Sequence, residues 1–346
     1  MNRLVTGALA IAAVAGAARL APTVRRKMAA VESVAEELRS PVMFLPLHLT
    51  NPAITRFVRS LPMMPYEFPA HIRHDVHTVQ GRDGRPDLRV HLYQRADRVR
   101  PSGVLYWMHG SGFVIGTPDM SHQFCTRVAD ELNVLVVSVD YRLAPENAFP
   151  EGIEDCYTGL LWVRDHVQEL GVEPARIAVG GDSAGGGLAA CLAQLVHDRG
   201  EVDLCFQLLV YPMLDDRTVL RTDHGGTGEF IWTPASNRFG WTSYLGRAPD
   251  AVSPPPYAAA ARRGDLTGLP PAWIGVGDID LFYTENVAYA AQLVAAGVPC
   301  DLDVVPGMYH GADGFPGPAD SPGMIAFNQA KIDALRAALR VTDQPV

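Results

Sequence analysis

Short apolar runs alternate with longer segments of helical spacing from about Leu88 to the end of the chain. Val104–Met108 and Val134–Val139 are continuous apolar runs rich in β-branched residues, which is typical of strands buried on both faces. This alternation predicts an α/β fold with a mostly parallel central sheet and helices on both faces. The further predicted strands are Arg176–Val179, Phe206–Val210, Ala272–Val276 and Asp301–Val305, and the predicted helices are His122–Leu132, Cys156–Val167, Ala184–His197, Glu285–Ala296 and Gly323–Leu339.

Two segments depart from this alternation. Between Val31 and Met64, apolar residues at helical spacing are interrupted by prolines, which predicts short broken helices. Residues 213–256 form a polar insertion rich in glycine and tryptophan. We therefore expect a leader and cap helices over residues 1–65, and one main domain over residues 66–346 that carries a cap insertion at about 213–256.

The first residues form an uncharged, alanine-rich stretch from Leu4 to Ala18, which is followed by the basic group Arg25-Arg26-Lys27. A signal peptide, a membrane anchor and an apolar cap helix are all compatible with this pattern, because the run is short for a bilayer span of about 20 residues. We expect a cytoplasmic protein. The alternative is an exported or membrane-associated protein, with membrane contact through residues 4–20.

Composition narrows the classes of partner. The chain has 346 residues, of which 48% are hydrophobic and 19% charged, and its formal net charge is −9 without an extended basic run. A nucleic-acid partner is not expected, because neutralising phosphates requires a basic face. The five cysteines are scattered and include no C-x-x-C pair, so we expect free thiols rather than disulfides or a zinc site.

The strongest chemical signal is Gly181-Asp182-Ser183-Ala184-Gly185, which fits G-x-S-x-G between a predicted strand and a predicted helix. A serine on such a sharp turn is lifted out of the sheet with its hydroxyl exposed, and the glycines avoid clashes where backbones crowd. Serine needs a base to become a good nucleophile. The motif therefore predicts Ser183 as the nucleophile of a hydrolase, while Asp182 is expected to make structural hydrogen bonds.

In this architecture, the acid and then the histidine of the catalytic triad follow the serine along the chain. Of the three histidines after Ser183, His197 ends the nucleophile's helix and His224 lies in the insertion, so His310, in a glycine-rich loop after the last strand, is the predicted base. Asp278 and Asp280 both follow a predicted strand, and the residues alone leave open which of them is the acid.

An oxyanion hole is the other requirement of acyl transfer, because backbone N–H groups must stabilise the developing negative charge. The segment His109-Gly110-Ser111-Gly112-Phe113 directly follows a predicted strand. We predict that the amides of Gly110, Ser111, Gly112 and Ala184 form this hole, with His109 as supporting motif residue.

Three motifs together carry a family resemblance: the segment 109–113, the run Asp140-Tyr141-Arg142-Leu143-Ala144-Pro145-Glu146, and the segment 181–186. They resemble the hormone-sensitive-lipase-like (bacterial family IV) esterases of the α/β-hydrolase superfamily, over about residue 88 to the C-terminus. The resemblance implies an α/β-hydrolase fold with a helical cap, and a carboxylic ester hydrolase acting on short to medium acyl chains. It also implies that Asp280 is the triad acid, since Glu285 and Ala296-Gly297-Val298-Pro299 follow it as in the family.

The chain departs from this family at Ser111, where the family usually has the middle one of three glycines. Serine keeps its N–H, so the hole can still form, but a positive φ at Ser111 would cost on the order of 1 kcal/mol. We also expect its side chain to narrow the alcohol side and to exclude bulky alcohols.

Several weaker signals have structural explanations. The spacing of His71, His74 and His77 suggests a metal, but no acidic or cysteine partner lies at a suitable spacing, so no metal and no cofactor are expected. We expect Arg142 and Glu146 to form a buried ion pair or to anchor a turn. Four aromatic residues of the insertion line an acyl pocket or form the small core of the cap: Trp232, Phe239, Trp241 and Tyr244.

The sequence therefore predicts a serine carboxylic ester hydrolase with the triad Ser183, Asp280 and His310, acting on a small-molecule acyl ester. Two alternatives remain at this point. One is an amide or N-acyl hydrolase, such as a deacetylase, with the same triad, and the other is a non-catalytic ligand-binding protein on the same fold. A homodimer is compatible with the sequence, which does not determine the oligomeric state.

Overall fold

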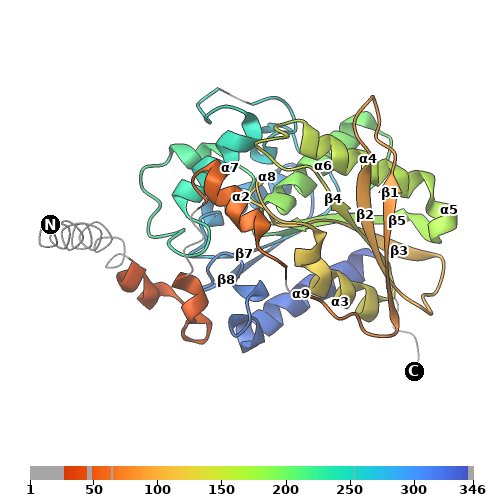
Figure 1. The fold of residues 1–346 in the computed structure, drawn as a ribbon, viewed down its shortest axis with the longest axis horizontal. Helices are drawn as coiled ribbons and strands as arrows, with labels where there is room; N and C mark the ends of the chain where they lie inside the picture. Colours follow the sequence, from red (N-terminus) through yellow and green to blue (C-terminus); the bar gives the residue numbers. More distant parts are fainter. Residues whose placement is uncertain (1–26, 45–48, 64, 253, 342–346) are drawn as a thin grey trace, which may run out of the picture.

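A single mixed sheet organises the protein (Figure 1). The computed structural model describes residues 27–44, 49–63, 65–252 and 254–341, and within them the strand order is β1-β2-β4-β3-β5-β6-β7-β8. β2 pairs antiparallel with β1 and β4, and all other neighbours are parallel, which confirms the mostly parallel sheet. The strands are β1 (Ile72–Val79), β2 (Leu88–Arg95), β3 (Ser102–Met108), β4 (Leu135–Asp140), β5 (Val172–Asp182), β6 (Phe206–Val210), β7 (Ala272–Gly277) and β8 (Cys300–Val305).

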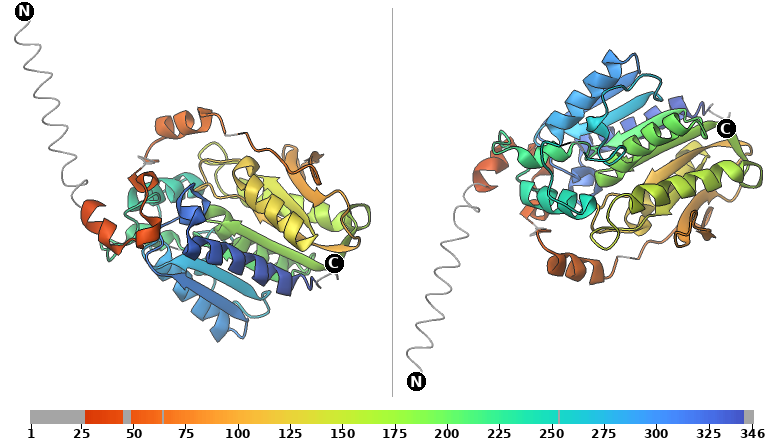
Figure 2. Two further views of the ribbon diagram at one scale, coloured as in Figure 1. Left: turned by 90° about the horizontal axis from the view of Figure 1, so that it is seen from below. Right: turned by 90° about the horizontal axis from the view of Figure 1, so that it is seen from above.

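Helices cover both faces of this sheet, and Figure 2 shows α3 and α9 over one face and α4 and α6 over the other. The described helices are α2 (Pro52–Ser60), α3 (His122–Leu132), α4 (Glu151–Asp165), α5 (Val167–Leu170), α6 (Ala184–Arg199), α7 (Pro234–Leu245), α8 (Tyr283–Ala295) and α9 (Pro322–Ala338). Before α2 the chain makes three short 3-10 turns, which confirms the predicted broken helices: Val31–Ser33, Glu36–Leu38 and Pro41–Phe44.

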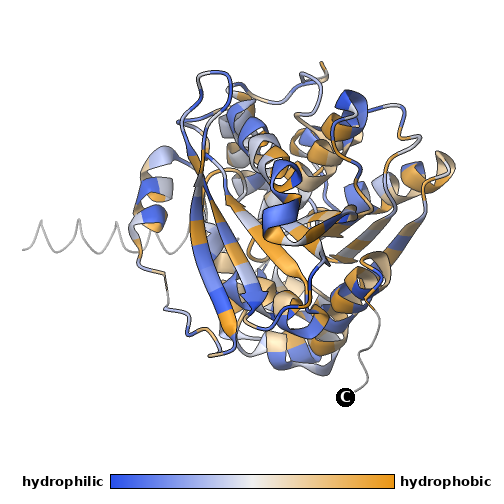
Figure 3. Cartoon of the chain, turned by 90° about the vertical axis from the view of Figure 1, so that its right-hand side faces the viewer, coloured by the Kyte–Doolittle hydropathy of each residue, from blue (hydrophilic) through white to orange (hydrophobic). Residues whose placement is uncertain are grey.

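Two hydrophobic cores lie on the two faces of the sheet, because successive strand side chains point to opposite sides. In β3, Tyr106 packs into the core beneath α4 and α6, whereas the neighbouring Leu105 and Trp107 pack into the core beneath α3 and α9. Figure 3 shows hydrophobic residues concentrated on the inner strands and more hydrophilic residues on the edge of the sheet. The continuous apolar runs of the sequence therefore correspond to strands buried on both faces, as predicted.

The structure differs from the predicted elements mainly at β1 and in the insertion. β1 is an edge strand whose middle residues are exposed, so its sequence lacks the apolar pattern of an inner strand. α4 begins at Glu151, five residues before the predicted start at Cys156. α7 lies inside the insertion and begins at Pro234, where Thr233 accepts a hydrogen bond from the backbone amide of Ser236.

The parallel strands end at the same edge of the sheet, which determines where the chemistry lies. β3, β5 and β7 end at Met108, Asp182 and Gly277, directly before the segments that carry the predicted oxyanion loop, nucleophile and acid. β8 ends at Val305, five residues before His310. Four segments that are distant in the sequence are thereby brought to one edge, where ligands of open α/β sheets bind.

Candidate active site

Ser183 occupies the sharp turn between β5 and α6. Its φ is 56° and its ψ is −121°, a conformation that costs a non-glycine residue on the order of 1–3 kcal/mol. The flanking glycines are sterically required, because a Cβ on Gly185 would lie 2.1 Å from the Met108 carbonyl oxygen and one on Gly181 would lie 2.4 Å from the Gly185 carbonyl oxygen. The strand–turn–helix context predicted from the motif is confirmed.

Ser183, His310 and Asp280 form one hydrogen-bonded chain. His310 Nε2 lies 2.9 Å from Ser183 Oγ, and His310 Nδ1 lies 2.7 Å from Asp280 Oδ2. The exposed fractions are 6% for Ser183, 7% for His310 and 1% for Asp280, so bulk water screens these contacts little. Asp280 is held in turn by the Phe282 amide, which donates to Asp280 Oδ1 at 2.9 Å. This arrangement can activate a serine hydroxyl and orient its base.

Asp278, the second aspartate that the sequence left open, has a different partner. Its Oδ1 accepts a hydrogen bond of 2.7 Å from the Gly307 amide, in the loop that leads to His310. Asp278 therefore ties the β7 loop to the histidine loop and leaves the imidazole to Asp280.

The segment after β3 adopts a strained backbone, but the strain is not at Ser111. The residues with positive φ are Gly112 at 53° and Phe113 at 66°. Ser111 Oγ accepts a hydrogen bond of 2.9 Å from the Phe113 amide and lies 2.7 Å from the Tyr141 hydroxyl oxygen, which is itself 2.6 Å from the His109 carbonyl oxygen. The serine side chain therefore turns into the protein and stabilises this loop.

Gly110 lies directly against the buried Asp182, because a Cβ on Gly110 would lie 2.4 Å from Asp182 Oδ2. Burial raises the pKa of the Asp182 carboxyl to about 6, although the Gly110 backbone acts in the opposite direction. Among the described residues, the amides of Gly110, Ser111, Gly112 and Ala184 donate to no backbone carbonyl. Of these four predicted oxyanion donors, Gly110 is the one that lies beside the Asp182 carboxylate.

His109 is enclosed below this loop. Its ring stacks on Tyr141 with a centroid distance of 4.4 Å and an interplanar angle of 14°. Complete burial lowers its pKa to about 4, so it is neutral near pH 7. His109 thus supports the loop through packing.

The aromatic residues of the insertion divide into two groups. Trp241 and Tyr244 are buried, and Phe113 stacks on Tyr244 at a centroid distance of 4.0 Å, so both form the small core between cap and body. Trp232 instead lies at the site: its ring is 6.4 Å from the His310 ring, and a Cβ on Gly112 would lie 2.1 Å from the indole. The sequence left open whether these aromatic residues line an acyl pocket or form a small core. Trp241 and Tyr244 belong to the core, whereas Trp232 lies at the site.

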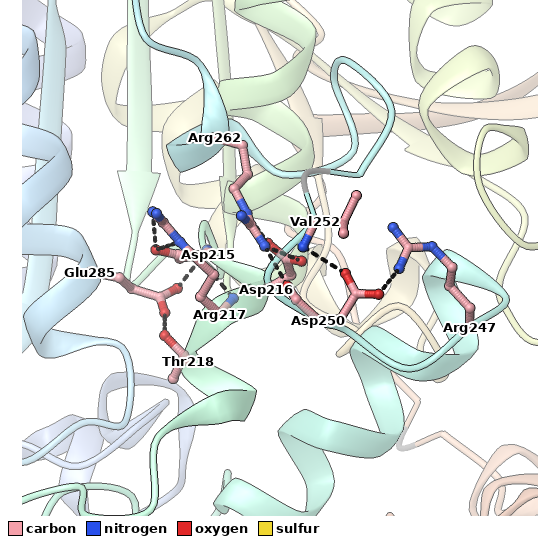
Figure 4. Close-up of polar contacts among 9 residues, drawn as sticks. All are labelled: Asp215, Asp216, Arg217, Thr218, Arg247, Asp250, Val252, Arg262 and Glu285. Carbon is pink, nitrogen blue, oxygen red and sulfur yellow. Dashed lines mark hydrogen bonds and ion pairs between the residues drawn. The ribbon is translucent and has the colours of Figure 1, made fainter.

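Buried ionisable side chains attach the insertion, residues 213–256, to the body, and they are drawn in Figure 4. Arg262 Nε donates to Asp216 Oδ1 at 2.6 Å, and its Nη2 donates to Asp216 Oδ2 at 2.9 Å. On the neighbouring side, Glu285 of α8 accepts hydrogen bonds from the Thr218 hydroxyl and, at 2.7 Å, from the Leu214 amide. Burial raises the pKa of Glu285 to about 8, although these hydrogen bonds act in the opposite direction.

Arg142 and Glu146 do not form the buried ion pair that the sequence suggested, because each has another partner. Arg142 donates twice to the buried Asp155, at 2.7 and 2.8 Å, and also contacts Glu151. Glu146 is half exposed and instead accepts a hydrogen bond of 2.9 Å from Arg59 of α2. Sequence spacing within the motif could not reveal these partners, because they come from other elements.

The histidines at 71, 74 and 77 lie on or beside β1 and form no shared site. His74 contacts His91 of β2 at 3.1 Å, and burial lowers the pKa of His74 to about 4. In the described ranges, no three His, Cys, Asp or Glu side chains are grouped to hold a metal ion. The same ranges contain no helix long and apolar enough to span a membrane, and the leader, residues 4–20, lies outside them.

Tyr141 and Arg59 support the site, but no role was predicted for them from the sequence. Tyr141 bridges His109 and Ser111, and only its place in the family motif pointed to it. Arg59 donates to Val114 beside the loop, and nothing in its local sequence indicates this contact.

Known proteins of similar sequence and fold identify the family of this chain. The family model described as "alpha/beta hydrolase fold" matches residues 105–313. Esterase LipI of Mycobacterium tuberculosis is 34% identical over 267 residues, which cover 77% of this chain and 82% of LipI. Carboxylesterase NlhH of the same species is 36% identical over 71% of this chain and 77% of its own length. Among solved structures, a bacterial heroin esterase superimposes with a TM-score of 0.75 at 33% identity, covering 89% of this chain and 99% of that chain.

Proposed function

Because the chain belongs to the hormone-sensitive-lipase-like esterases of the α/β-hydrolase superfamily and is a carboxylic ester hydrolase, we propose that Ser183, His310 and Asp280 are its catalytic triad. The observation that carries this proposal is the hydrogen-bonded chain from Ser183 Oγ through both ring nitrogens of His310 to Asp280. A carboxylate at Nδ1 holds the imidazole in the tautomer whose Nε2 can accept the serine proton.

The proposed reaction proceeds through an acyl-enzyme. His310 Nε2 takes the hydroxyl proton while Ser183 Oγ attacks the ester carbonyl, and the amides of Ser111, Gly112 and Ala184 stabilise the resulting oxyanion. Collapse breaks the bond to the alcohol oxygen, which receives the proton from His310. A water molecule then gives a proton to His310 Nε2 and attacks the acyl carbonyl, and collapse of this second intermediate breaks the bond to Ser183 Oγ. Ser183 Oγ takes the proton back from His310, which releases the carboxylic acid and regenerates the hydroxyl of Ser183 and the neutral imidazole.

We infer a preference for esters of short to medium acyl chains. The indole of Trp232 lies against Gly112 and near His310, so it occupies space beside the proposed oxyanion hole. The nucleophile and base are themselves more than nine-tenths buried. Long acyl chains would have to displace this aromatic side chain.

A non-catalytic ligand-binding role is a weaker alternative, because the hydrogen-bonded triad supports an active enzyme. An amide or N-acyl hydrolase would use the same residues but must protonate an amine leaving group. Matched p-nitrophenyl esters and p-nitroanilides of the same acyl group distinguish the two, and we expect the ester to be hydrolysed much faster.

The direct test is Ser183→Ala, assayed with p-nitrophenyl butanoate. We expect kcat to fall by about 10⁴-fold or more, because the acyl-enzyme can no longer form. Ser60→Ala, at an exposed serine of α2, is the matched control and should keep wild-type activity. A fluorophosphonate probe should label the wild-type and control proteins but not the Ser183 variant, and activity retained by that variant would falsify the assignment.

A further inference from the structure

Arg59 of the N-terminal helix α2 reaches across to the body of the enzyme with its whole guanidinium group. Nε donates to the Val114 carbonyl oxygen at 2.7 Å, Nη2 to the Ala144 carbonyl oxygen at 2.7 Å, and Nη1 to Glu146 Oε2 at 2.9 Å. Each of its three nitrogens thus has its own acceptor. The side chain is 25% exposed, so water screens these charged hydrogen bonds only in part.

The two backbone acceptors border the strained part of the proposed oxyanion loop. Val114 directly follows Gly112 and Phe113, which both have positive φ. Ala144 donates its amide to the Phe113 carbonyl oxygen at 2.9 Å, so the segments around 113 and 144 are already linked on one side. Arg59 joins the same two segments from the side of α2. Strained backbone persists only where its surroundings determine it from several directions.

We propose that Arg59 is a positioning residue that couples the docking of α2 to the orientation of the oxyanion-hole amides. The proposal rests on the proposed function, because it assumes that the Ser111 and Gly112 amides receive the oxyanion. In this proposal, helix α2 contributes to transition-state stabilisation through Arg59, without contacting the substrate. A purely structural role would instead attach α2 to the body and leave the loop unaffected.

Arginine suits this role and lysine does not. The guanidinium is planar and offers donors in three fixed directions, whereas an ammonium group is a compact point charge on a flexible stem. Lysine at position 59 can therefore keep one of the three contacts but cannot bridge Val114, Ala144 and Glu146 together. Arg56, one turn earlier on α2, is exposed and provides a matched control with the same charge.

The test compares the full-length variants Arg59→Ala, Arg59→Lys and Arg56→Ala, measuring kcat and KM with p-nitrophenyl butanoate and the unfolding midpoint. Loss of one oxyanion donor costs about 10²–10³ in kcat, so misorienting the donors should lower kcat by about tenfold or more in Arg59→Ala, with KM changed less than kcat. Arg59→Lys should lie between wild type and Arg59→Ala, and Arg56→Ala should stay within about twofold of wild type.

A transition-state analogue provides the readout that a structural role would not change. A boronic acid inhibitor forms a tetrahedral adduct with the serine, so its affinity should weaken in Arg59→Ala in proportion to the loss of kcat/KM. Unchanged kcat and inhibitor affinity in Arg59→Ala, or a loss confined to KM or to the unfolding midpoint, would overturn the proposal. If Arg59→Ala does not fold, the kcat and the inhibitor affinity of Arg59→Lys test the proposal in the same way. Full activity of Ser183→Ala would instead overturn the proposed function itself.

Discussion

The inner strands of the sheet and the attachment of the insertion, residues 213–256, depend on different forces. The inner strands β3 and β6 are completely buried and pack apolar side chains on both faces. The insertion also has an aromatic core, but its attachment to the body depends on the buried ion pair of Asp216 with Arg262 and on the buried carboxyl group of Glu285. Apolar burial contributes through the sum of many small contacts, whereas a charged anchor depends on a single partner.

This difference predicts how the inner strands and the attachment of the insertion respond to substitutions and to pH. Apolar packing tolerates volume-conserving substitutions and does not titrate. A buried ion pair contributes little net stability compared with apolar residues of the same size, but removing one partner leaves a buried charge uncompensated. The apolar packing of the inner strands should therefore resist changes of pH, while the attachment of the insertion should be sensitive to pH and to charge deletion at a few positions.

The largest expected effect is a loss of kcat when Asp280, in the body, is substituted. Asp280→Asn keeps the geometry but removes the charge that stabilises the His310 imidazolium, so kcat should fall by about 10⁴-fold while the fold remains intact. Steady-state kinetics and circular dichroism measure the two properties. Asp278→Asn is the matched control, since the Asp278 carboxylate accepts a hydrogen bond from the backbone amide of Gly307. A larger loss of kcat in Asp278→Asn than in Asp280→Asn would reverse the assignment.

The next effect concerns the stability of the cap. Arg262→Met leaves the carboxylate of Asp216, which is 1% exposed, without its bidentate partner. The free energy of unfolding in urea should fall by about 3–5 kcal/mol. The double variant Asp216→Leu/Arg262→Met removes both charges and should recover part of this loss. Equal stability of the single variant and wild type would show that the pair is not an anchor.

A smaller effect should appear as a pH dependence at Glu285. Burial raises the pKa of this carboxyl from 4.5 to about 8, so the folded protein holds a proton that the unfolded chain releases at lower pH. Its contribution to stability is complete below about pH 4.5 and is lost as the pH rises towards 8. Glu285→Gln cannot titrate, so it should gain stability relative to wild type across this range. Urea unfolding at pH 5, 7 and 9 tests this, and a constant difference would contradict it.

The smallest effect is expected for an exposed pair at the edge of the same insertion. Arg247 and Asp250 lie 3.0 Å apart, but their side chains are 41% and 53% exposed. Arg247→Ala should change the free energy of unfolding by about 0.5 kcal/mol or less, because solvent already screens the pair. A loss comparable to that of Arg262→Met would mean that burial does not explain the contrast between the two arginines.

Much of the fold could be predicted because it depends on local periodicity. Continuous apolar runs indicated the inner strands, and the helices between them followed from helical spacing. β1 escaped prediction because an edge strand with an exposed face lacks that pattern. The start of α4 was predicted five residues late, since helix ends depend on local capping and packing that periodicity does not determine.

The sequence by itself determined the strand–turn–helix context of Ser183, because the G-x-S-x-G motif lies between a strand and a helix that local periodicity predicts. It also determined the order in which nucleophile, acid and histidine follow their strands. The residues alone left Asp278 and Asp280 open, and the family resemblance pointed to Asp280, which the tertiary structure places against His310. Only the tertiary structure revealed that Arg59 binds Val114. Periodicity arises within a few residues, whereas a long-range hydrogen bond exists only once packing has brought its partners together.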